Sequence, residues 1–167
     1  MKYIKTYEAA KDPKVKLLVE SICNFMIAAF KELKITTELK VSNYDIVVLW
    51  KEKNKKTGII ENKKDSIMHL SRDIKKNIIS LMFFEYSVDG GWGGLWQDPN
   101  LTVIYNMIKT YISSELGIIE WKDETWWRGD KSRHILINFD YIDNFIQYFT
   151  ELITFIPIYI DSNKYNL

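Results

Sequence analysis

The sequence has very few of the residue types on which many enzymes and secreted proteins depend. It contains one cysteine, Cys23, and can therefore form neither an internal disulfide nor a cysteine-based zinc site. Only two histidines occur, His69 and His134, and their spacing matches no metal-ligand pattern. We therefore expect no metal and no cofactor, and the cysteine content suits a reducing compartment.

Long apolar runs are also missing. A helix needs roughly 20 consecutive apolar residues to span a bilayer, and the longest apolar runs, near 25–30 and 152–160, are much shorter. Lysines interrupt the apolar residues at the N-terminus, which lacks the apolar core and small-residue cleavage site of a signal peptide. We expect a cytoplasmic protein that does not interact with a membrane.

The spacing of apolar residues and the position of proline caps predict an alternation of helices and strands. Asp12-Pro13 and Asp98-Pro99 both read as a helix cap followed by proline in the first turn. Helices are expected at 13–33, 66–85, 101–117 and 140–157, and strands at 35–41, 45–52, 57–61, 118–122 and 134–138. The prediction is a single α+β domain, with about four helices packed on a small, mostly antiparallel sheet of about five strands. It covers residues 1–160, and residues 161–167 are expected to be a frayed tail.

Glycine is scarce, and four of the seven glycines lie in one segment, Gly90-Gly91-Trp92-Gly93-Gly94-Leu95-Trp96. This density of glycine would weaken a helix or a strand, and it predicts a loop between the second and third expected helices. The glycines match neither a P-loop nor the dinucleotide fingerprint. Two tryptophans in such a loop indicate either a contact surface or a segment that folds back onto the core.

A second aromatic segment, residues 121–130, begins at the end of the fourth expected strand, and in it tryptophans are interleaved with charged residues. Protein interfaces concentrate their binding energy in Trp, Tyr and Arg, which favours a docking role. The alternative is that these indoles seal the ends of the core. Together the two segments supply the predicted partner-binding residues: Trp92, Trp96, Trp121, Asp123, Glu124, Trp126, Trp127, Arg128 and Asp130.

Charge is unevenly distributed along the chain. Residues 1–64 carry a net charge of +6 and residues 65–167 a net charge of −5. The lysines are densest between Lys51 and Lys64, a stretch without arginine. Specific readers of nucleic acid tend to use arginine, so we consider nucleic acid an unlikely partner and interpret these lysines as protection of a strand edge against aggregation.

No group of residues forms a convincing catalytic constellation. A helix over residues 66–85 would bring His69 and Asp73 together, but no nucleophile is linked to them by a motif. Cys23 lies among the apolar positions of the first helix and is expected to be a buried, inert thiol. We therefore predict no catalytic residues.

Two functional hypotheses remain. The first is a non-enzymatic protein-binding module of the immunity, antitoxin or inhibitor type, which neutralises a partner by docking on it. The acidic second half suits a basic toxin or enzyme as the partner. The alternative is a small glycoside-type hydrolase that uses the carboxylates of Glu120 and Glu124 in an aromatic cleft.

Overall fold

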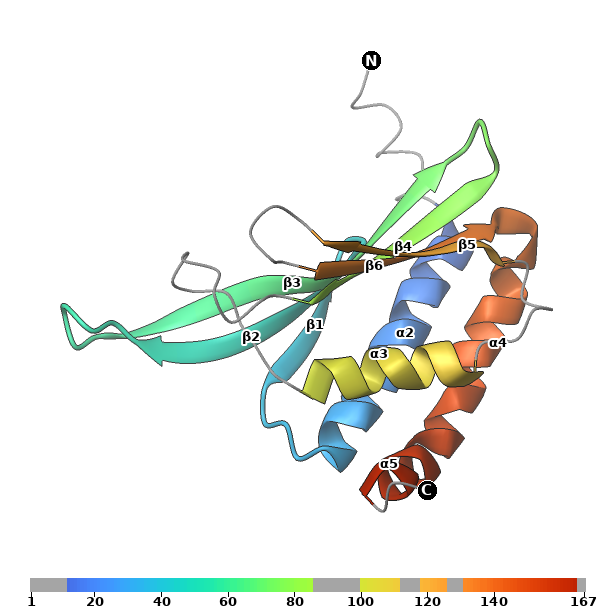
Figure 1. The fold of residues 1–167 in the computed structure, drawn as a ribbon. Coiled ribbons are helices and arrows are strands. Elements are labelled where there is room, and N and C mark those ends of the chain that lie inside the picture. Colours follow the sequence, from blue (N-terminus) through green and yellow to red (C-terminus); the bar gives the residue numbers. More distant parts are fainter. Residues whose placement is uncertain (1–11, 86–99, 112–117, 126–130, 165–167) are drawn as a thin grey trace.

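The computed structural model describes residues 12–85, 100–111, 118–125 and 131–164, which form one antiparallel sheet with helices on one of its faces (Figure 1). The six strands lie in the order β1-β2-β3-β4-β6-β5. Their bounds are β1 Glu38–Ser42, β2 Asp45–Lys53, β3 Ile60–Asp73, β4 Ile78–Glu85, β5 Ile118–Thr125 and β6 Lys131–Asn138. The helices are α2 Pro13–Glu32, α3 Asn100–Tyr111, α4 Ile142–Leu152 and α5 Ile156–Lys164, with short 3-10 turns at Phe139–Tyr141 and Ile153–Phe155. The predicted α+β class is confirmed.

Helix α2 begins where the sequence predicts. The Asp12 side chain accepts a hydrogen bond from the backbone N–H of Lys14, and Pro13 occupies the first turn. The apolar face of the helix packs against the sheet and against α4, where the rings of Phe25 and Phe149 lie 5.8 Å apart. A single cluster of buried residues joins α2, α3, α4, α5 and the four central strands, so these elements share one core.

The helix predicted over residues 66–85 is wrong. The structure has instead the second half of β3, a tight turn and all of β4. In β4 the buried side chains alternate, at Ile79, Leu81 and Phe83, which is the period of a strand. In the turn the backbone of Asn77 has a φ of 55°, which asparagine tolerates better than most residues. A positive φ is incompatible with a right-handed helix that continues through this residue. Three of the four predicted helices are therefore present.

Three further expectations differ from the structure: the neighbours of the glycine- and tryptophan-rich segment, the extent of the last helix and the start of the C-terminal tail. The glycine- and tryptophan-rich segment follows strand β4, so it does not lie between two helices as expected. The last predicted helix is divided into α4 and α5, and Pro157 is the second residue of α5. Helix α5 continues to Lys164, so residues 161–164 are helical and not frayed. Residues 165–167 lie outside the described part.

Strands β2 and β3 extend well beyond the rest of the sheet. The pairing of β1 with β2 ends at Leu49, and the pairing of β3 with β4 ends at Met68. Beyond these points β2 and β3 pair only with each other in the described part, up to Lys53 and Ile60. We call residues 50–64 the β2–β3 arm, and Figure 1 shows it projecting away from the helices.

Candidate functional site

The predicted partner-binding residues belong to two groups. Trp121, Asp123 and Glu124 lie on β5, which is an edge strand of the sheet. The others lie outside the described residues: Trp92, Trp96, Trp126, Trp127, Arg128 and Asp130. What the structure adds is the position of the strand ends to which these segments are attached.

Three strand ends meet at one end of the sheet. Strand β6 lies between β4 and β5, and its first residue, Lys131, pairs with Glu85 on one side and with Thr125 on the other. Residue 85 is the last described residue before the glycine- and tryptophan-rich segment, and residues 125 and 131 flank residues 126–130 of the second aromatic segment. Both aromatic segments therefore leave the sheet from neighbouring backbone positions, although they are far apart in the sequence.

The β2–β3 arm projects from this same end of the sheet. Strand β3 is antiparallel to β4, so the start of β3 and the end of β4 lie at the same end of the sheet (Figure 1). Eight residues of β3, 60–67, extend beyond its last pair with β4, and at roughly 3.3 Å per residue they span about 26 Å. One end of the molecule thus carries the arm and the attachment points of both aromatic segments.

The arm has a well-defined turn at its tip. The Asn54 side chain accepts hydrogen bonds from the backbone N–H groups of Lys56 and Thr57 and donates one to Glu61 Oε1 at 2.8 Å. Lys63 Nζ donates to Glu61 Oε2 at 2.6 Å. The hydrogen bonds from Lys63 and Asn54 lower the pKa of the Glu61 carboxyl, so this carboxylate stays charged and holds the turn.

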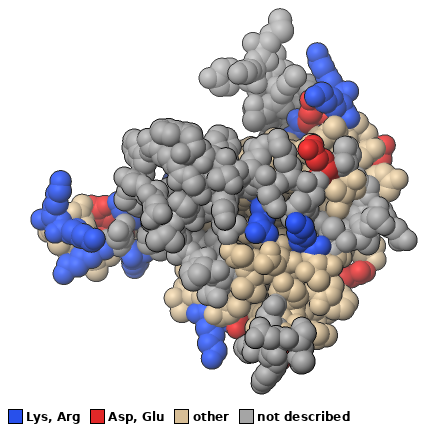
Figure 2. Space-filling view, viewed as in Figure 1, with Lys and Arg blue, Asp and Glu red and all other residues tan. Residues whose placement is uncertain are grey.

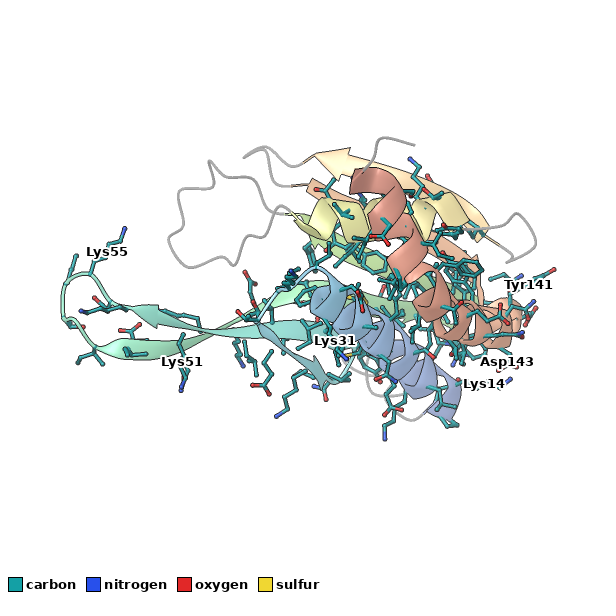
Figure 3. The ribbon with its side chains drawn as sticks, turned by 90° about the horizontal axis from the view of Figure 1, so that it is seen from below. Lys14, Lys31, Lys51, Lys55, Tyr141 and Asp143 are labelled. Atoms are coloured by element: carbon teal, nitrogen blue, oxygen red, sulfur yellow. The ribbon has the colours of Figure 1, made fainter. Side chains whose placement is uncertain are left out.

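Lysines surround the arm. The six are Lys51, Lys53, Lys55, Lys56, Lys63 and Lys64, against the two acidic residues Glu52 and Glu61. Figure 2 shows the blue of lysine gathered at the far end of the arm, and Figure 3 shows Lys51 and Lys55 projecting away from the ribbon. From the sequence these lysines are recognisable, but the third strand is expected to end at Glu61, whereas β3 continues to Asp73. The position of the lysines on a projecting ribbon was therefore not predicted.

The two glutamates of the alternative hydrolase lie on a single strand, β5. Glu120 is exposed and pairs in register with Leu136, and Glu124 pairs with Ser132 on the same two strands. Four residues along one strand separate their Cα atoms by about 13 Å.

His69 has a partner other than the expected Asp73. It lies opposite Asp45 on the neighbouring strand, with Nδ1 3.0 Å from Asp45 Oδ1. Ser66 Oγ donates to the same Asp45 oxygen at 2.9 Å. The carboxylate therefore lies between hydroxyl and imidazole, whereas in a nucleophilic triad the imidazole lies between the other two groups. The predicted His69–Asp73 pair is wrong because this segment is a strand.

Cys23 is buried in α2, as expected, with 5% of its surface exposed. Burial raises the pKa of its thiol, which disfavours the reactive thiolate. Among the described residues no three His, Cys, Asp or Glu side chains are placed to hold a metal ion. No helix in the described ranges is long and apolar enough to cross a membrane.

Comparison with known proteins gives no relative: no family model, no curated protein and no solved structure matches this chain.

Proposed function

We propose that this protein is a non-enzymatic binding protein of the immunity, antitoxin or inhibitor type, which neutralises another protein by docking on it. The observation that carries the proposal is the meeting of Glu85, Thr125 and Lys131 on three adjacent strands. It gives the two aromatic segments a common origin at one end of the sheet. Five of the six tryptophans of the chain belong to these segments and to β5.

The platform beneath this end of the sheet suits a docking role. Strands β4 and β6 lie inside the sheet, and Phe83 and Ile135 are buried against the helices. Arg133 Nη1 donates to Asn106 Oδ1 on α3 at 3.0 Å, which ties β6 to the helical layer. Anchors attached to a rigid support lose less conformational freedom on binding than anchors on a flexible one.

Charge suggests the nature of the partner. Within residues 121–130, Asp123, Glu124 and Asp130 accompany the tryptophans, and Lys122 and Arg128 are the two basic residues. An excess of acidic residues next to aromatic residues in the sequence favours a basic partner surface, because opposite charges accelerate association. A basic toxin or enzyme is therefore the class of partner that we propose.

The test is capture of the partner followed by reconstitution. The tagged full chain is used as bait in an extract of its native host, and a stoichiometric partner is identified, purified and titrated by calorimetry. We expect Trp126→Ala and Trp92→Ala each to weaken this complex by more than ~1 kcal/mol, because truncated aromatic anchors lose most at an interface. The product of an adjacent gene is the first candidate for direct titration.

Tyr141→Ala is the matched control. Tyr141 is an exposed aromatic residue, 41% accessible, just before α4 and far from the arm (Figure 3). Its truncation should leave affinity unchanged, and circular dichroism should show all three variants folded. If Trp126→Ala and Trp92→Ala bind like the wild type, the proposed surface is not the docking surface.

A further inference from the structure

We propose that the β2–β3 arm binds the phosphate backbone of duplex nucleic acid without sequence specificity. This inference uses none of the predicted protein-binding residues and does not depend on the proposed docking function. It rests on the shape, exposure and charge of residues 50–64.

The hydrophobic core does not need an arm of this length. The buried side chains of β2 are Ile46 and Val48, and the first buried side chain of β3 is Ile67. No described side chain between these positions is fully buried. A tight turn near Leu49 and Lys64 would join the two strands and leave the same core, so the extension indicates a role outside the domain.

The chemistry of the arm fits phosphate better than protein. It carries six lysines, two glutamates and no arginine, and one of those glutamates, Glu61, is already bonded to Lys63. Lysine is depleted in protein interfaces, where Arg, Tyr and Trp dominate. Lysine is sufficient for sequence-independent attraction to phosphates, since that attraction depends on charge and not on the shape of the donor.

The shape of the arm fits the major groove of a duplex. Beyond Leu49 the arm is a ribbon of two strands, and strands in a sheet lie about 4.8 Å apart. The major groove, about 12 Å wide, admits a two-stranded ribbon. Alternation along the strands puts Lys51 and Lys53 on one face with Ile60 and Asn62, while Lys55 and Lys56 stand at the tip.

The expectation from sequence, in which the lysines only protect a strand edge and nucleic acid is an unlikely partner, concerned specific recognition and does not explain all of these features. Lysines on an edge do discourage pairing between molecules. A protective arm would also avoid exposed apolar side chains, yet Ile59 and Ile60 at the tip are 63% and 67% exposed. In the major groove, apolar side chains can contact the edges of the bases.

The experiment measures binding of the purified full chain to a labelled random-sequence duplex of about 20 base pairs by fluorescence anisotropy. Between about 50 and 200 mM salt we expect weak binding, with a Kd of roughly 10⁻⁴ to 10⁻⁶ M at the higher salt. The variant Lys53→Gln/Lys55→Gln/Lys56→Gln should bind about tenfold more weakly or worse. The plot of log K against log salt should be less steep in this variant, with a slope smaller in magnitude by about 2 to 3. Each of the three lysines that no longer neutralises a phosphate accounts for roughly one unit of slope.

The matched control is Lys16→Gln/Lys75→Gln/Lys76→Gln, which removes the same charge from exposed lysines outside the arm. Affinity and salt slope should stay within about twofold of the wild type. Absence of duplex binding, or equal losses in the two triple variants, would overturn the proposal. So would binding to poly-glutamate or to vesicles containing phosphatidylserine without binding to the duplex, since these results would assign the arm to an acidic protein or to a membrane.

Discussion

At the scale of single residues, Asp12 links the start of α2 to the sheet. One carboxylate oxygen caps the helix at the Lys14 N–H, and the other pairs with Arg72 on β3. The Arg72 guanidinium also lies 3.6 Å from the centre of the Phe139 ring. Both partners of the ion pair are largely covered, with 16% and 19% of their side chains exposed. The Asp12–Arg72 pair therefore joins α2, β3 and the 3-10 turn at Phe139–Tyr141.

Asp12→Ala should lower the free energy of unfolding by about 2–4 kcal/mol, since it removes a cap and leaves a mostly covered guanidinium unpaired. Urea unfolding followed by circular dichroism measures this loss. Asp143→Ala is the control, because Asp143 pairs with Lys14 at the surface, where 63% of the Asp143 side chain is exposed. The control should lose less than about 1 kcal/mol. Equal losses would show that the Asp12–Arg72 contact carries no special weight.

Cys23 should react with a thiol reagent only when the domain opens. Its side chain is buried and burial raises its thiol pKa, so the native protein presents little thiolate. We expect the reaction at pH 8 to be at least about a hundredfold slower in buffer than in denaturing urea. The absorbance of the released chromophore measures this rate. Rapid labelling of the native protein would contradict the buried position of this residue.

At the scale of elements, the stability of β3 should change along its length. Residues 68–73 pair with β4 and lie over the core, whereas 60–64 pair with β2 alone in the described part. A two-stranded ribbon is marginal in water. Amide hydrogen exchange followed by NMR should be fast at 60–64 and slow at 68–70 within the same strand. Uniform protection along β3 would show that the arm is as stable as the sheet.

The turn of the arm should also respond to pH. Its partners Lys63 and Asn54 lower the pKa of Glu61 below its ordinary value of 4.5. A lowered pKa means that the folded turn prefers the charged carboxylate, so this stabilisation is complete above that ordinary value and is lost as the pH falls through the lowered pKa. Amide shifts of residues 54–61 should therefore change at acid pH in the wild type. In Glu61→Gln this acid transition should be absent.

At the scale of the whole molecule, the domain should fold with the same stability when the arm is removed. Trp50 and Lys63 are opposite each other in register, and a two-residue Asn-Gly turn can join such a pair. Replacing residues 51–62 with Asn-Gly should change the free energy of unfolding by less than about 1 kcal/mol, since no described side chain in this range is buried. Thermal unfolding by circular dichroism checks this expectation. Loss of the fold would show that the arm supports the core.

Elements that depend on neighbouring residues could be predicted from the sequence, whereas pairings between distant strands could not. The Asp12-Pro13 cap and the apolar spacing correctly predicted α2, and apolar spacing predicted the described part of α3, because caps and amphipathic faces are local signals. The expected cap of α3, Asp98-Pro99, lies outside the described residues. Residues 66–85 misled the prediction because Ile67, Leu70, Ile74 and Ile78 fit a helical spacing while the same segment also alternates as a strand. The strand conformation of residues 78–85 is favoured over a helix because β4 pairs with β6, and no local sequence pattern reveals this pairing. The meeting of residues 85, 125 and 131 depends on this same register, so it could not be predicted either.

The pairing of β4 with β6 also bears on how the chain reaches its native state. Every other neighbouring pair of strands in the described part is consecutive along the chain, while this one joins 78–85 to 131–138, more than forty positions away. Closing so long a loop costs entropy before any contact compensates it, and such topologies fold slowly. Truncation of a side chain between β4 and β6, such as Ile137→Val, should therefore reduce the refolding rate. Truncation between β2 and β3, such as Ile46→Val, should mainly accelerate unfolding.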